Sequence, residues 1–116
     1  MKALGFGHRL RCALHGLRVA FALEASFRIQ LLAALFAIGT LLWLRPPLVW
    51  VALVAVLIGI VLAAELLNTA LERALDGLHP GEAEFVRIAK DCAAGAVLVL
   101  SATAVVVFAV MLVAVL

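Results

Sequence analysis

The feature that most constrains the fold is a run of seventeen residues, Leu48 to Ala64, without a charged side chain. A helix of that length covers most of the hydrocarbon core of a bilayer, which is roughly 30 Å thick. The whole 116-residue chain is similar, because 68% of its residues are hydrophobic and 14% are charged. Soluble domains carry roughly a quarter charged residues. We therefore expect an all-α integral membrane protein.

Three apolar stretches predict three membrane spans within one membrane domain, residues 1–116. The spans are expected at residues 25–44, 48–67 and 93–116. The last of them is apolar apart from Ser101 and Thr103. Both hydroxyls can bond to their own helix backbone.

Helix-breaking residues separate the spans. Arg45-Pro46-Pro47 ends the first span, since proline cannot continue a helix. Residues 68–91 are expected to form a cytoplasmic helix extension, which Gly77 caps, followed by a loop with a polar connector at 82–91. Residues 1–23 mix basic and apolar side chains, which predicts an amphipathic helix on an anionic membrane surface.

The distribution of Lys and Arg predicts the orientation in the membrane. Only Arg45 lies in the turn between the first two spans, while the other eight basic residues lie at the N-terminus, in the second loop or beside them. Basic residues are enriched on the cytoplasmic side of membrane proteins. We therefore expect a multi-pass protein with its N-terminus and residues 73–91 in the cytoplasm and its C-terminus outside.

A polar stripe follows the apolar run of the second span. At about 100° per residue its members lie within roughly 60° of the direction of Glu65 on a helix. They are Glu65, Asn68, Thr69, Glu72 and Asp76. A carboxylate this close to lipid tails must face protein or water. The stripe is either a polar contact between packed helices or a functional site.

Charged residues at the inner ends of the other spans favour a functional site. Glu24 and Arg28 lie near the start of the first span, and Lys90 and Asp91 precede the third. All three spans thus bring ionisable groups to one membrane depth. Acidic pairs can hold Mg²⁺, basic groups can meet phosphate, and Glu65 is a candidate general base. These parts suit phosphoryl transfer to a membrane-bound alcohol.

Four motifs in order carry a family resemblance. They are Gly16-Leu17-Arg18, Glu24-x-x-Phe27-Arg28, Glu65-x-x-Asn68-Thr69-Ala70-Leu71-Glu72-x-x-x-Asp76 and Ala89-Lys90-Asp91-x-Ala93-Ala94-Gly95. With them the chain resembles the prokaryotic diacylglycerol kinase and undecaprenol kinase family. The resemblance implies a homotrimer in the bacterial inner membrane, with sites at subunit interfaces facing the cytoplasm. It also implies transfer of the γ-phosphate of ATP to a lipid hydroxyl with Mg²⁺, and no nucleic-acid partner.

The resemblance also implies roles for individual residues. Glu65 is the expected catalytic base, with Asn68 orienting it, and both meet the lipid substrate together with Arg28. Glu24 and Glu72 are expected to bind the metal ion. The expected nucleotide-binding residues are Glu24, Glu72, Asp76, Lys90, Asp91 and Arg18.

More than one lipid substrate and more than one class of protein fit the sequence. Diacylglycerol is the favoured substrate, but Asn68-Thr69-Ala70 and Ala93-Ala94-Gly95 look closer to undecaprenol kinases. A small oligomeric transporter would also explain an intramembrane glutamate. It would not explain why the other charged residues gather at one interface. A catalytically silent membrane scaffold is the third alternative.

Overall fold

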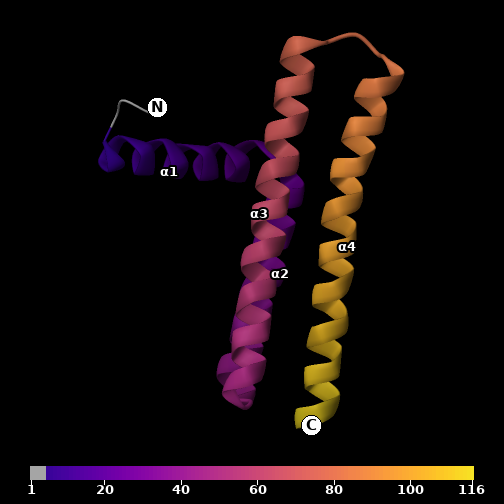
Figure 1. The fold of residues 1–116 in the computed structure, drawn as a ribbon. Helices are drawn as coiled ribbons and strands as arrows, with labels where there is room; N and C mark the ends of the chain where they lie inside the picture. The colour runs from indigo at the N-terminus through magenta and orange to yellow at the C-terminus, as the bar shows by residue number, and fades with distance from the viewer. Residues whose placement is uncertain (1–4) are drawn as a thin grey trace.

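The computed structural model describes residues 5–116, and Figure 1 shows its four helices. They are α1 (Phe6–Leu23), α2 (Ala25–Leu44), α3 (Leu48–Leu78) and α4 (Glu84–Val115). The first four residues of the predicted surface helix lie outside the described part of the chain. The described residues are helical apart from short connections, which confirms the predicted all-α class.

Three of the helices, α2, α3 and α4, are long and apolar enough to cross a membrane. At about 1.5 Å per residue, the 20 residues of α2 match a hydrocarbon core roughly 30 Å thick. The 31 residues of α3 extend about 15 Å beyond such a core. Most of their large apolar side chains face outward, as expected for helices surrounded by lipid. The protein is therefore a multi-pass membrane protein.

Helix α3 lies between the other two spans and supplies the centre of the small core. The buried side chains come from all three spans, including Phe27 and Ala34 of α2, Val54 and Val61 of α3, and Met111 of α4. The one buried charged residue, within the described chain, is Glu65 of α3 at 3% exposure. The helix packing thus surrounds the start of the polar stripe.

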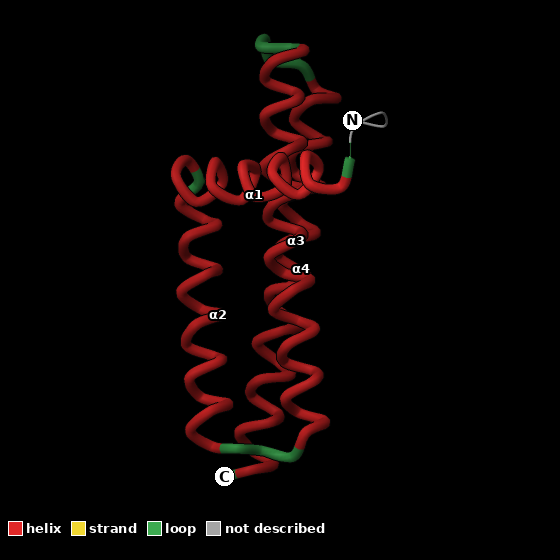
Figure 2. The backbone as a smooth tube through the Cα atoms, turned by 90° about the vertical axis from the view of Figure 1, so that its left-hand side faces the viewer, coloured by secondary structure: helices red, strands yellow, loops and turns green. Residues whose placement is uncertain are grey.

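Helix α1 runs across the bundle instead of along it, and one extended residue joins it to α2 (Figures 1 and 2). That residue is Glu24, with φ −115° and ψ 110°. The guanidinium of Arg28 holds the corner, because Nη1 donates to the carbonyl oxygens of Phe21 at 2.7 Å and Ala22 at 3.2 Å. A cation at a helix C-terminus satisfies carbonyls that lack partners within the helix. Arg28 therefore fixes the first turn of α2 against α1.

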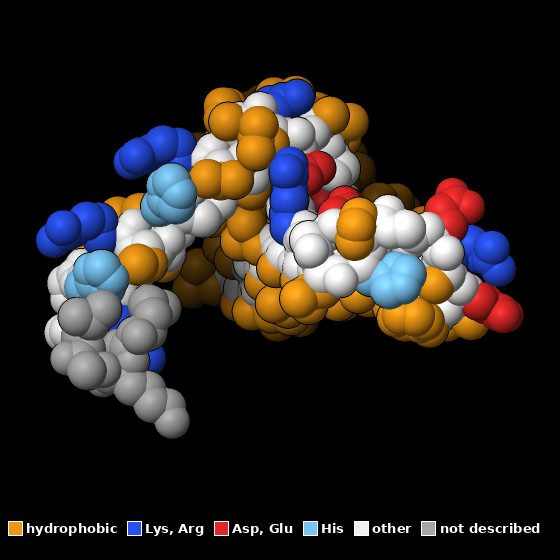
Figure 3. All heavy atoms as spheres, turned by 90° about the horizontal axis from the view of Figure 1, so that it is seen from above, with side chains coloured by type: hydrophobic (Ala, Val, Ile, Leu, Met, Phe, Trp, Pro, Cys, Tyr) orange, Lys and Arg blue, Asp and Glu red, His pale blue; other side chains and the backbone are white. Residues whose placement is uncertain are grey.

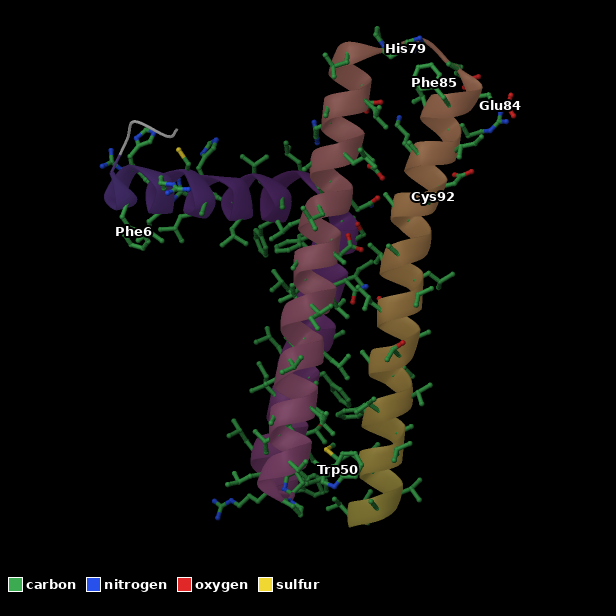
Figure 4. All side chains as sticks on the ribbon, in the orientation of Figure 1. Phe6, Trp50, His79, Glu84, Phe85 and Cys92 are labelled. Carbon is green, nitrogen blue, oxygen red and sulfur yellow. The ribbon has the colours of Figure 1, made fainter. Side chains whose placement is uncertain are left out.

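The turn between α2 and α3 lies at the opposite end of the bundle, near Trp50 (Figure 4). Arg45 adopts a left-handed conformation with φ 48°, and its N–H donates to the carbonyl of Leu41 at 2.9 Å. Pro47 is the N-cap of α3, and its carbonyl accepts a hydrogen bond from the N–H of Trp50 at 2.9 Å. The expected break at Arg45-Pro46-Pro47 thus lies between two helix ends.

Helix α3 ends within residues 77–81, as expected, but the residue that caps it is not the expected glycine. Gly77 lies within the helix, and its C-cap is His79, whose N–H donates to Leu75 at 2.8 Å. Pro80 explains the end, because a proline disfavours helical backbone in the residue before it. His79 also approaches the carbonyl of Gly81 through Nδ1 at 2.9 Å and meets the ring of Phe85 edge-on (Figure 4).

The polar connector expected at residues 82–91 is largely helical, because α4 begins at Glu84. An acidic side chain in the first turn interacts favourably with the helix dipole, which suits a start at Glu84. The polar residues of this segment therefore belong to the end of a helix that extends beyond the membrane, and not to a loop. As a result, Lys90 and Asp91 lie on a rigid helix that faces α3.

Side chains of α2, α3 and α4 line an apolar cavity of about 250 Å³. At its edge Nε2 of Gln30 donates to Oγ of Ser101 at 3.0 Å, joining α2 to α4. Ser101 therefore has a partner on another helix, whereas Thr103 bonds to the carbonyl of Val99 in its own helix.

The role of Arg28 at the corner can be tested with the two native cysteines, Cys12 on α1 and Cys92 on α4. Spin labels on both should give a narrow distance distribution in bilayers when labelled chains are diluted with a cysteine-free variant. Arg28→Ala removes both bonds to the α1 carbonyls, so the distribution should broaden. Arg45→Ala, at the opposite end, should leave it unchanged. An equally narrow distribution for Arg28→Ala would show that packing alone holds the corner.

Candidate active site

The charged residues gather at one end of the bundle, which we call the charged end: α1, the first turns of α2, residues 65–78 of α3 and residues 84–91 of α4. Glu24, between α1 and α2, and Glu82, between α3 and α4, lie at the same end, and Arg45 is the one described charged residue at the other end. Viewed onto this end, basic side chains and histidines follow α1, while acidic and basic side chains alternate over the opposite arm (Figure 3). The structure thus collects charges from all four helices at one membrane depth.

Glu65 is the deepest member of the polar stripe and is almost completely buried, with 3% of its surface exposed. Its Oε2 accepts a hydrogen bond from Oγ of Ser26, in the first turn of α2, at 3.1 Å. No described residue donates a hydrogen bond to Oε1. A buried carboxylate with one free oxygen is suited to accept a proton from a nearby hydroxyl.

Asn68 and Glu72 follow Glu65 on the same face of α3. Nδ2 of Asn68 donates to Oε1 of Glu72 at 3.2 Å. A carboxylate can only accept, so the amide nitrogen must face Glu72 and the amide oxygen must point away. That oxygen is buried and has no hydrogen-bond partner among the described residues. Buried polar atoms are almost always paired, so Oδ1 of Asn68 is positioned to accept from a bound group.

Glu24 lies beside α3, because Nη2 of Arg73 donates to its Oε1 at 3.4 Å. Arg73 is mostly exposed, so this ion pair contributes little to stability. The pair connects the corner between α1 and α2 with the turn of α3 that also carries Glu72. Glu24, which precedes α2, thus contacts the residue that follows Glu72 in α3.

Asp76 and Lys90 join α3 to α4 beyond the apolar stretches. Nζ of Lys90 donates to Oδ1 of Asp76 at 2.6 Å. This hydrogen bond raises the pKa of Lys90, so the lysine stays positively charged at neutral pH. The pair lines an open polar groove of about 630 Å³, which Asp91 and the loop at residues 79–83 also line. Four carboxylates and two basic groups line this groove, so Arg87 and Lys90 are the groups there that could meet an anionic ligand.

Three predicted site residues have less definite positions. The guanidinium of Arg28 donates hydrogen bonds to carbonyl oxygens of α1. Arg18, on α1, is exposed and makes no hydrogen bond or ion pair with residues 5–116. Asp91 is also exposed and has no such partner in that range, although it lines the polar groove. Within a single chain, Glu65, Asn68 and Glu72 therefore lie together on α3, whereas Arg28, Arg18 and Asp91 make no hydrogen bond or ion pair with them.

Two residues of the site were not predicted from the sequence. Ser26 contacts Glu65, and Arg73 contacts Glu24. Both pairs join residues about 40 or more positions apart, so helix periodicity could not connect them. Ser26 could have been suggested by its position in the sequence, because it lies one helical turn before Gln30 and near the membrane depth expected for Glu65.

Metal binding by this chain alone has limited support. Among residues 5–116, no group of three or more His, Cys, Asp or Glu side chains could hold a metal ion. Mg²⁺, however, is often bound by only one or two carboxylates together with waters and substrate phosphates. The hard oxygen atoms of Glu24 and Glu72 fit that mode of binding.

Comparisons with known proteins show which family this chain resembles. The model of the family described as prokaryotic diacylglycerol kinase matches residues 11–112. A protein of Synechocystis named diacylglycerol kinase is 41% identical over 99 residues, which are 84% of this chain and 56% of that protein. This chain thus spans little more than half the length of that relative. Proteins with the same name from Escherichia coli K12 and Shigella flexneri are 30% identical over 112 residues, 97% of this chain and 87% of theirs.

Proposed function

The chain belongs to the prokaryotic diacylglycerol kinase family, and from this premise we propose that it is an ATP-dependent lipid kinase. It transfers the γ-phosphate of ATP to the hydroxyl of a membrane lipid. The observation that carries the proposal is the buried carboxylate of Glu65, which has one free oxygen at the depth where a lipid hydroxyl meets the polar end of the bundle.

Glu65 acts as the general base. As the lipid oxygen forms its bond to the γ-phosphorus, the hydroxyl proton passes to the free Oε1, and the bond from phosphorus to the leaving oxygen of ADP breaks. Asn68 accepts a hydrogen bond through its buried Oδ1 and so helps to orient the lipid or an intervening water. Phosphoryl transfer depends mainly on positioning and charge stabilisation, which such a rigid site can provide.

Glu24 and Glu72 would hold Mg²⁺, which when bound neutralises charge on the ATP phosphates. The nucleotide lies against α3 and α4, where Lys90 supplies a positive charge and Asp76 keeps its ammonium in place. Asp91 contacts the nucleotide from the polar groove. Arg18 approaches the phosphates from α1. Arg28 keeps the corner in place and so orients the lipid entrance.

Diacylglycerol is the proposed acceptor, because the relatives reported above carry that name. Undecaprenol is the second candidate, favoured by Asn68-Thr69-Ala70. The proposed assembly is a homotrimer in the bacterial inner membrane. We propose that its charged end lies in the cytoplasm, and the distribution of Lys and Arg supports this orientation. In this orientation the lipid arrives laterally and ATP arrives from the cytosol.

The distribution of polar groups argues against a transporter. Below the charged end, the described spans contain few polar side chains, and Thr40 and Thr103 bond to carbonyls of their own helices. Gln30 is paired with Ser101. A transport path would need ionisable or hydrated groups farther across the membrane. The arrangement instead supports chemistry at one interface.

The proposed reaction is tested by phosphate transfer from labelled ATP in mixed micelles that contain diacylglycerol or undecaprenol. Labelled diacylglycerol product is expected, and exclusive labelling of undecaprenol would identify the second candidate instead. Glu65→Gln keeps the size of the side chain but cannot accept the proton. Turnover should therefore fall about 10²- to 10⁴-fold. Full turnover in well-folded Glu65→Gln would remove Glu65 as the base.

The metal role of Glu72 is tested by titrating Mg²⁺ at saturating ATP. Glu72→Ala should raise the Mg²⁺ concentration that gives half-maximal velocity by about tenfold or more. Glu72→Gln is the matched variant, because it retains an acceptor for Asn68 but loses the charge. Both variants should respond alike if the carboxylate binds metal. A normal titration for Glu72→Gln would instead limit Glu72 to orienting Asn68.

A further inference from the structure

Glu65 is held by a residue of another helix that the proposed mechanism does not use. Oγ of Ser26 donates to Oε2 of Glu65 at 3.1 Å across the packing of α2 on α3. This is the one hydrogen bond that the described residues make to the buried carboxylate. A hydrogen bond to a charged, desolvated group is stronger than one between neutral groups.

The contact leaves the carboxylate with two different oxygens. Oε2 is occupied by the serine hydroxyl, while Oε1 receives no hydrogen bond from residues 5–116. A glutamate side chain has several rotatable bonds, and ordering it costs conformational entropy. A fixed Oε2 therefore restricts Oε1 to a small range of positions before any substrate arrives.

The position of Ser26 is itself fixed. Ser26 lies in the first turn of α2, two residues after the extended Glu24. Arg28, half a turn farther along, binds the carbonyl oxygens of Phe21 and Ala22 at the end of α1. Buried Phe27 lies between Ser26 and Arg28 in the sequence and packs this turn against the bundle. The serine hydroxyl thus belongs to a rigid corner and not to a free helix end.

We propose that Ser26 is a positioning residue for the phosphoryl-transfer site: its hydroxyl anchors Oε2 of Glu65 so that Oε1 faces the lipid hydroxyl. The proposal rests on the function of Glu65 as the base. Ser26 does not touch the reacting atoms, and it acts through the orientation of the carboxylate. Correct orientation of a catalytic group contributes directly to the rate of the chemical step.

A structural contact between α2 and α3 is the alternative, and it makes different predictions. A contact that only stabilises the bundle would lower thermal stability when removed and would leave the rate of the folded enzyme unchanged. A positioning contact lowers kcat in folded protein, with little change in the KM for MgATP, because the Ser26 hydroxyl bonds to Glu65 and, among the described residues, to none of the proposed nucleotide-binding side chains.

The test compares Ser26→Ala and Ser26→Thr in the full chain, purified and assayed by labelled phosphate transfer to diacylglycerol. Ser26→Ala should lower kcat about ten- to a hundredfold, as expected for the loss of a hydrogen bond to a charged group. The KM for MgATP should stay within about twofold. Ser26→Thr keeps the hydroxyl and should restore most of the rate. Ser101→Ala, which removes a hydroxyl from the Gln30 pair, is the control and should leave kcat unchanged.

Coupling to Glu65 is measured with a double-mutant cycle. Glu65→Asp retains a carboxylate but withdraws it from Ser26 by one methylene, so adding Ser26→Ala should cost much less than it does beside Glu65. Equal losses in both backgrounds, or wild-type kcat in folded Ser26→Ala, would overturn the proposal. Full turnover in Glu65→Gln would instead refute the base itself. The two failures are therefore distinguishable.

Discussion

Burial of a carboxylate at the edge of an apolar helix bundle is the constraint on which this structure depends. Glu65 is desolvated on α3, and an uncompensated charge there would cost several kcal/mol. It is compensated from a second helix, because the first turn of α2 presents the Ser26 hydroxyl. The corner between α1 and α2 therefore matters for function, since it determines where that hydroxyl lies.

Helix length explains how a nearly featureless apolar chain builds a polar site. Helices α3 and α4 are about 15 Å longer than a bilayer core requires, so their ends can carry charges outside the lipid. The bond between Asp76 and Lys90 links these ends. One continuous helix, α3, thus carries the base at the membrane boundary and the nucleotide-binding positions beyond it. A rigid element sets the distance between the two reactants.

Sequence patterns were most accurate where a single helix decides the outcome. Hydropathy gave three spans, and periodicity placed Asn68 and Glu72 on one face, where they are hydrogen-bonded. Patterns failed where neighbouring segments compete. Pro80 ended α3 after Gly77 instead of at it, and the polar segment before the third span proved to be helix. Ser101 accepts a hydrogen bond from Gln30 of another helix, a contact that the pattern within one helix could not predict.

The sequence by itself determined the membrane class, the helix count and the identity of the ionisable side chains, because these follow from local hydrophobicity and from spacing along one helix. Only the tertiary structure decided which oxygen of Glu65 is occupied, that Arg73 contacts Glu24, and that Arg28 binds the end of α1. These contacts join different helices. Their geometry depends on how α2 and α3 pack and on the angle at Glu24, and neither is encoded in the period of any single helix.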